Sequence, residues 1–99
     1  MFQIQQTDVF SAWLSGLRDP KSKARIVARI ESARLGNLGD VKSLGGGLSE
    51  MRVHFGTGYR LYFVRTGKIV LLLLSGGDKS TQKRDIERAR RMRKELIQE

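Results

Sequence analysis

The sequence contains no cysteine and only one histidine, His54. Without cysteine there can be no disulfide bond and no thiolate metal site, and one histidine is too few for an ordinary zinc cluster. The longest apolar run, residues 69–74, is far shorter than the roughly 20 residues that span a bilayer. The first residues, MFQIQQTD, lack the charged-then-apolar pattern of a signal peptide. We therefore expect a cytoplasmic protein with no metal, no other cofactor and no membrane contact.

Acidic residues are scarce relative to basic ones. Nineteen Lys and Arg residues oppose ten Asp and Glu residues, which gives a formal net charge of +9 over 99 residues. An excess of this size in a chain this short favours a polyanionic partner, usually a nucleic acid. An acidic protein partner would satisfy the same charge, and a basic surface without a dedicated partner is the plain alternative.

The N-terminal third of the chain predicts a short strand followed by two helices. The segment FQIQQ, residues 2–6, alternates apolar and polar side chains, as in a strand with one buried face. Apolar residues at helical spacing follow over residues 9–17. Asp19 is a typical N-cap residue and Pro20 a typical first helical residue, so a second helix is expected from there to Gly36. The two helices would form an αα-hairpin.

The remainder predicts three strands and a final helix. Residues 36–47 are rich in glycine and are expected to be irregular. The predicted strands cover residues 48–55, 59–65 and 68–75, and the helix runs from Lys79 to about Gln98. Tight turns at residues 56–58 and 66–67 make these strands antiparallel neighbours. We therefore predict one α+β domain over residues 1–99 with the order β-α-α-β-β-β-α, in which the helical hairpin packs on a small, mainly antiparallel sheet.

The turn at residues 56–58 predicts the register of the first β-hairpin. If its immediate neighbours close the turn, His54 lies opposite Arg60, and Arg52 lies opposite Tyr62. Opposed side chains project from the same face of a sheet, so these four side chains would converge. The apolar residues of both strands would then lie on the other face, under the helical hairpin.

Such a cationic face suits RNA. Arginines that converge on one face repel each other, and a phosphate would relieve the repulsion because guanidinium groups bind phosphate oxygens bidentately. The ring of Tyr62 could stack on an unpaired base. One alternative is an exposed sheet face with no ligand. In addition, Glu50 points to the same face as Arg52, two residues away on the same strand, and could neutralise its charge.

The last strand ends in two glycines, where we expect a sharp bend that places Lys79 beside Arg60. Cations at this place would stabilise the negative charge that develops on a phosphate during RNA cleavage. A histidine transfers protons near neutral pH. The candidate catalytic residues of a metal-free ribonuclease are therefore Arg52, His54, Arg60 and Lys79.

Four motifs lie between Gly39 and Ala89: LGGGL, E-x-R-x-H, GYR-x-YF and GGDK-S-x-Q-x-x-DI. Together they resemble the RelE/ParE toxin superfamily, and most closely its HigB-like branch of phage-derived addiction module killer proteins. The resemblance implies a RelE-like fold and the toxin of a type II toxin–antitoxin module. Its cognate antitoxin would be a small protein, typically of the helix-turn-helix class. Many such toxins are mRNA interferases, which cut mRNA on the ribosome without a metal and so inhibit translation.

The resemblance also implies roles for individual residues. RelE-type toxins carry basic residues on the strand before the glycine hairpin, in the Gly-Tyr-Arg after it and just after the last strand. In this sequence those positions are Arg52 and His54, then Arg60, then Lys79. RelE uses a tyrosine early in the last helix for proton transfer, whereas Asp85 falls at about that position here. His54 is the first substitute as general base, followed by Lys79 or Asp85.

The basic residues of the last helix and the reaction itself leave alternatives open. Lys83 and Arg84 are candidate RNA-binding residues, and a solvated helix face is the plainer interpretation. ParE uses the same fold to poison DNA gyrase, so the fold does not decide the activity. A third alternative is a toxin remnant that binds nucleic acid or the antitoxin without catalysis.

Overall fold

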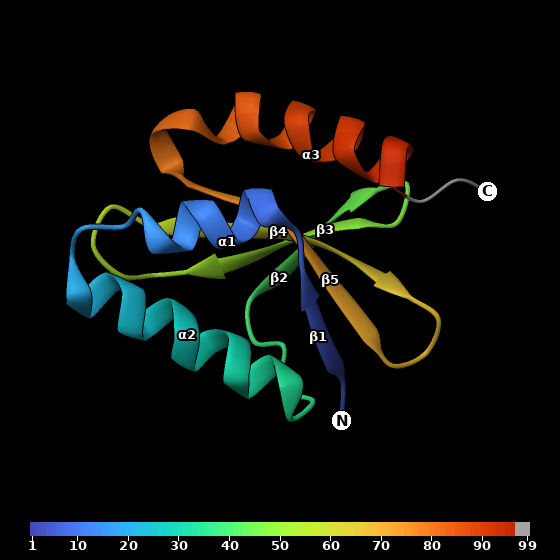
Figure 1. Ribbon diagram of the computed structural model, residues 1–99, viewed down its shortest axis with the longest axis horizontal. Helices are drawn as coiled ribbons and strands as arrows, with labels where there is room; N and C mark the ends of the chain where they lie inside the picture. Colours follow the sequence, from blue (N-terminus) through green and yellow to red (C-terminus); the bar gives the residue numbers. More distant parts are fainter. Residues whose placement is uncertain (97–99) are drawn as a thin grey trace.

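The computed structural model describes residues 1–96 and combines a five-stranded sheet with three α-helices (Figure 1). The strands are β1 (Gln3–Gln6), β2 (Val41–Gly45), β3 (Leu48–Val53), β4 (Tyr59–Thr66) and β5 (Val70–Asp78). The helices are α1 (Asp8–Ser15), α2 (Pro20–Arg34) and α3 (Gln82–Leu96), and the 3-10 turn η1 (Lys79–Thr81) precedes α3. The predicted α+β class is confirmed. The expected end of the last helix near Gln98 lies outside the described residues.

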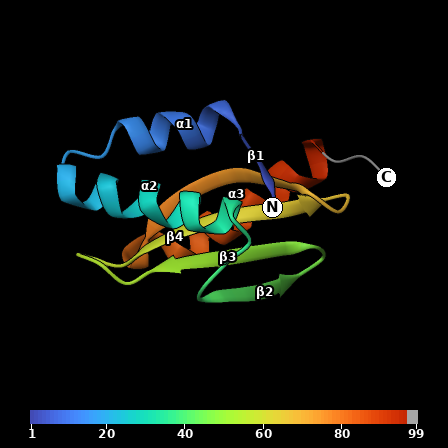
Figure 2. The same ribbon diagram turned by 90° about the horizontal axis from the view of Figure 1, so that it is seen from below.

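The sheet is mixed, with strand order β1-β5-β4-β3-β2. Strand β1 pairs with β5 in parallel, and the other three pairs are antiparallel. Helices α1 and α2 lie on one face of the sheet, and α3 lies on the other (Figure 2). The leucine run of β5 therefore serves two cores, because Leu71 and Leu73 face α1 and α2 while Leu72 and Leu74 face α3. Within residues 1–96 no helix combines the length and apolar character needed to cross a membrane.

One strand was not expected. Residues 41–45 form β2, an edge strand that pairs with β3, within the segment predicted to be irregular. Gly45, the last residue of β2, and Gly46 and Gly47 of the β2–β3 connection all have φ between 61° and 85°. This left-handed conformation favours glycine, so the glycines mark a tight turn between two strands and not an irregular segment.

The register of the β3–β4 hairpin differs from the prediction by two residues. Arg52 lies opposite Arg60, and Glu50 lies opposite Tyr62. The connection spans residues 54–58 and contains a hydrogen bond from the Gly58 N–H to the Phe55 carbonyl, at 3.0 Å. Because a shift of two preserves the alternation of side chains, the predicted sorting of the strand residues between the two faces still holds. The face that carries Arg52 and Arg60 is cationic only at one end, because α3 covers the rest of it with an apolar core.

The two glycines at the end of β5 do not bend the chain. Strand β5 continues through Gly76 and Gly77 to Asp78, which lies opposite Tyr59. Gly77 is thereby opposite Arg60, and Lys79 begins the next turn. The approach of Lys79 to Arg60 comes from strand pairing and not from the predicted bend.

Candidate functional site

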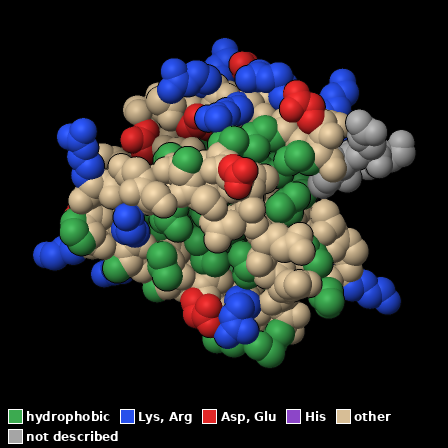
Figure 3. Space-filling view, viewed as in Figure 1, with side chains coloured by type: hydrophobic (Ala, Val, Ile, Leu, Met, Phe, Trp, Pro, Cys, Tyr) green, Lys and Arg blue, Asp and Glu red, His purple; other side chains and the backbone are tan. Residues whose placement is uncertain are grey.

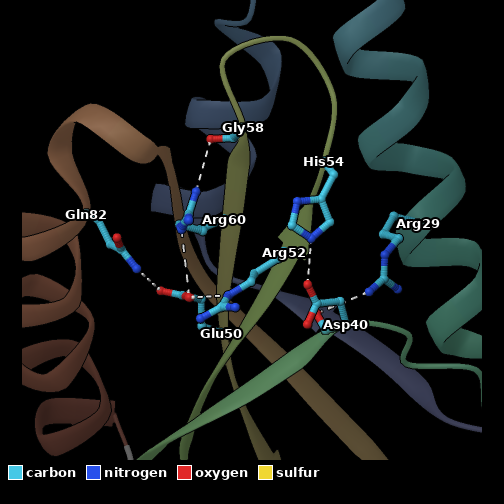
Figure 4. A network of polar contacts seen from close by, with 8 residues as sticks. All are labelled: Arg29, Asp40, Glu50, Arg52, His54, Gly58, Arg60 and Gln82. Carbon is cyan, nitrogen blue, oxygen red and sulfur yellow. Dashed lines mark hydrogen bonds and ion pairs between the residues drawn. The ribbon is translucent and has the colours of Figure 1, made fainter.

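Arg52 and Arg60 are cross-strand partners whose side chains converge on one carboxylate (Figure 4). Glu50 Oε1 lies 3.1 Å from Arg52 Nε and 3.8 Å from Arg60 Nε. The other oxygen, Oε2, accepts a hydrogen bond of 2.9 Å from Nε2 of Gln82, the first residue of α3. The Glu50 side chain is 0% exposed. The interpretation of Glu50 as an internal partner of Arg52 is confirmed, and Arg60 shares it.

The arginine pair remains partly accessible. The side chain of Arg52 is 29% exposed and that of Arg60 is 12% exposed. Both guanidinium groups meet Glu50 through Nε, and Arg60 Nη1 donates a hydrogen bond of 3.4 Å to the Gly58 carbonyl. Two positive charges face one negative charge, so the group formed by Glu50, Arg52 and Arg60 retains a net positive charge and can accept an anion.

Lys79 reaches this group from the end of β5. Its backbone N–H donates a hydrogen bond of 3.0 Å to the Gly58 carbonyl. A Cβ on Gly58 would lie 3.5 Å from Lys79 Cδ and 3.6 Å from Arg60 Nη1, so both side chains flank the same glycine. The φ of Gly58 is 81°, in the left-handed region that favours glycine. The structure therefore brings Arg60 and the exposed Lys79 together at the β3–β4 loop, and Arg52 joins them as the cross-strand partner of Arg60.

His54 does not lie opposite Arg60, because β3 ends one residue before it. Its Nε2 lies 2.6 Å from Asp40 Oδ2 (Figure 4). The backbone carbonyl of Asp40 also accepts a hydrogen bond from Arg29 of α2. The hydrogen bond from His54 holds the pKa of Asp40 below its usual value. His54 lines the same open pocket as Arg52, whereas Arg60 and Lys79 do not line this pocket.

The prediction that Tyr62 stacks on an RNA base is wrong. Its side chain is fully buried under α3, in a core with Leu48, Val64, Leu74 and Ala89. This burial raises the pKa of Tyr62, so the phenol stays protonated. The apolar stripe of the last helix was the available signal, because it requires an apolar partner on one face of the sheet.

Asp85 and Gln82 show what the beginning of α3 contributes. Asp85 is buried, and its Oδ2 accepts a hydrogen bond of 2.6 Å from Thr81 Oγ1. Gln82 was not among the predicted site residues, although it is the glutamine of the motif GGDK-S-x-Q-x-x-DI. Its position one turn before Asp85 faces the sheet, which is why it reaches Glu50.

Lys83 and Arg84 lie on the exposed side of the same helix. They line an open pocket together with Ser80, Thr81 and Glu87. Figure 3 shows Lys and Arg side chains gathered over α3. This surface adjoins Lys79 along the chain, so a polyanion at the arginine pair could continue over it.

The fold and the site define a small basic α+β protein with a cationic group at one end of its sheet. Residues 12–94 match the family described as Phage derived protein Gp49-like (DUF891), and the chain belongs to this family. The chain is also 45% identical over 94 residues to a protein of Haemophilus influenzae described as "Uncharacterized protein". The alignment covers 95% of each of the two chains.

Proposed function

We propose that the protein is the toxin of a type II toxin–antitoxin module and cleaves mRNA on the ribosome. The carrying observation is the convergence of Arg60 and Lys79 at Gly58, with Arg52 directly opposite Arg60 on the neighbouring strand. Membership in a phage-derived family and the resemblance to RelE-type toxins support the same interpretation. The fold in this proposal is RelE-like, and the partners are a cognate antitoxin, mRNA and the ribosome.

The proposed reaction is a transesterification within the RNA. The 2′-oxygen attacks the neighbouring phosphorus, the P–O5′ bond breaks, and the products end in a 2′,3′-cyclic phosphate and a 5′-hydroxyl. One proton leaves the 2′-hydroxyl and one proton reaches the departing 5′-oxygen. Both transfers require titratable groups, whereas the charge on the phosphorane requires fixed cations.

The cationic group provides the fixed charge. Arg52 and Arg60 are assigned to the non-bridging phosphate oxygens, because guanidinium groups bind such oxygens bidentately. Lys79 is assigned to the departing 5′-oxygen side, where its ammonium group stabilises the charge and can supply a proton. Lys83 and Arg84 are assigned to the flanking phosphates of the same strand.

His54 is assigned the role of general base. It is the only histidine of the sequence, and histidine is the side chain whose ordinary pKa lies near neutral pH. Two observations support this assignment: Asp40 lies at hydrogen-bond distance from one ring nitrogen, as an orienting carboxylate does, and the ring lines the same pocket as Arg52. Asp85 is the weaker candidate, because it is buried and already accepts a hydrogen bond from Thr81.

The decisive experiment is induced expression followed by mapping of transcript ends in growth-arrested cells. We expect cuts within translated reading frames, and we expect the double variant Arg60→Ala/Lys79→Ala to restore growth and leave transcripts intact. Growth arrest with intact transcripts would overturn the proposal. DNA double-strand breaks in such growth-arrested cells would identify a gyrase poison. If expression of the protein has no effect on growth, the result would instead indicate a non-catalytic binding protein.

A further inference from the structure

The carboxylate of Glu50 is fully buried beneath Arg52 and Arg60. Transfer of a charged group out of water is unfavourable, even when a partner is present. An apolar residue at Glu50 would pack against the core below α3 without this cost. Glu50 instead contacts three polar side chains, those of Arg52, Arg60 and Gln82. These contacts indicate that the carboxylate has a task besides packing.

The geometry of the contacts defines that task. Glu50 accepts a hydrogen bond of 3.1 Å from Arg52 Nε and forms an ion pair, without a hydrogen bond, with Arg60 Nε at 3.8 Å. A guanidinium group is planar, so anchoring Nε also fixes the direction of the terminal nitrogens. Within residues 1–96 the terminal nitrogens of Arg52 have no hydrogen-bond partner, and Nη1 of Arg60 is directed to the Gly58 carbonyl. The outward edges of both groups are therefore oriented before an anion arrives.

Gln82 extends this arrangement to the lysine. Its amide donates to the second oxygen of Glu50 across 32 residues of sequence. Gln82 directly follows the turn η1, which begins at Lys79. One carboxylate thus joins the hairpin that carries the arginines to the segment that carries Lys79.

We infer that Glu50 and Gln82 are positioning residues, which set Arg52, Arg60 and Lys79 in register around one phosphodiester of RNA. This inference rests on the proposed function, because the phosphodiester is the group that the site would bind. It assigns the chemistry to the three cations and the geometry to the buried hydrogen bond beneath them. Neither Glu50 nor Gln82 touches the substrate.

The test exchanges the two residues. The double variant Glu50→Gln/Gln82→Glu keeps the same atoms and the same net charge, but moves the carboxylate from the strand to the helix. A merely structural role is compatible with this exchange, because the hydrogen bond between the two side chains can re-form in reverse. A positioning role is not, because the oxygen that faces the Nε edges of Arg52 and Arg60 becomes a neutral amide oxygen, which holds a guanidinium group more weakly than a carboxylate oxygen does. The single variant Glu50→Gln removes the charge altogether, and Glu31→Gln on α2 is the control for loss of one glutamate elsewhere.

Three measurements are made on the purified full chain. Cleavage of ribosome-bound mRNA gives kcat and KM, and fluorescence of Trp13 against urea gives stability. Binding of a 2′-O-methyl RNA oligonucleotide, which cannot be cleaved, gives an affinity that is independent of the reaction. For the exchange variant we expect a fall in kcat of about tenfold or more and a weaker oligonucleotide affinity, with unfolding near that of the parent. Glu31→Gln should match the parent in all three.

The contrary results are equally defined. Parent-like kcat and affinity in the exchange variant would overturn the positioning role, as would losses no larger than the unfolded fraction explains. If the parent itself leaves ribosome-bound mRNA intact, the proposed function fails. The Nε–Hε signal of Arg52 in NMR spectra, the group that donates to Glu50, then decides the inference separately. Slow exchange in the parent and fast exchange in both Glu50 variants would support anchoring, and fast exchange in the parent would overturn it.

Discussion

The indole ring of Trp13 occupies the space that a side chain on Gly76 would need. On the opposite face of β5, the carboxyl group of Asp85 fills the corresponding space at Gly77. Neighbouring residues of a strand point to opposite faces, so α1 and α3 approach the sheet at this one place from both sides. The Gly-Gly pair thus allows two helices to pack closely on β5, next to the segment that carries Lys79.

Substitution of Gly76 by alanine should destabilise the fold. The added methyl group would overlap the ring of Trp13, and overpacking of this kind costs about 1–3 kcal/mol. Urea unfolding followed by the fluorescence of Trp13, the only tryptophan, measures the change. Ser15→Ala, an exposed substitution on the same helix, serves as the control. Equal stability of the two variants would show that the ring moves aside without cost.

Neutralisation of Lys79 should reduce cleavage without affecting stability. Lys79 is exposed, so Lys79→Gln removes no buried contact, but it removes one of the three cations of the site. Loss of one preorganised charge from a site of this kind costs about a hundredfold or more in kcat. Lys68→Gln, in the exposed β4–β5 turn, removes the same charge at a distance from the site. Equal kcat values for the two variants would exclude a catalytic role for Lys79.

Local patterns of the sequence predicted the fold class and the faces of the strands. The two-residue error in register did not mix the faces, because side chains alternate with a period of two. Long-range packing was less accessible. The sequence gives α3 an apolar stripe but not the sheet face that it covers, so Tyr62 was placed at the surface. For the same reason the contact of Gln82 with Glu50 was not predicted, because the two residues are 32 positions apart in the sequence.

Glycine was the residue type that the sequence left most ambiguous. Glycines at residues 45–47 form a turn after an unexpected strand, whereas Gly76 and Gly77 lie within a strand. In the first case backbone conformation requires glycine, and in the second case neighbouring side chains exclude anything larger. Composition alone does not separate these causes, because the second depends on Trp13 and Asp85.

The pairing of Asp40 with His54 should make stability depend on pH at the acidic end. The folded protein lowers the pKa of Asp40, mainly through the hydrogen bond from His54. An acid with a lowered pKa stabilises the fold above its unfolded pKa of about 3.9, and this contribution is lost as pH falls through the folded pKa. Asp40→Asn should therefore be less stable than the parent at neutral pH, and the difference should shrink below about pH 4.

Urea unfolding between about pH 3 and pH 7 measures this difference. Glu87→Gln, an exposed substitution on α3, is the control for removal of a carboxylate. A gap between Asp40→Asn and the parent that stays constant over the whole range would show that the effect does not come from ionisation of Asp40.

The double variant Lys83→Glu/Arg84→Glu should bind RNA more weakly, in a salt-dependent way. Its kcat at saturating mRNA should be unchanged. Each phosphate contact to a single strand contributes about −0.7 to the slope of log K against log salt concentration, so loss of two contacts should reduce the slope by about 1.4. Binding of the 2′-O-methyl oligonucleotide between about 50 and 300 mM salt gives this slope. The matched control is Arg18→Glu/Lys21→Glu, which reverses two exposed cations on the helical hairpin. Overall attraction to the +9 chain would weaken binding equally in both double variants, whereas a phosphate track along α3 predicts the larger change at Lys83 and Arg84.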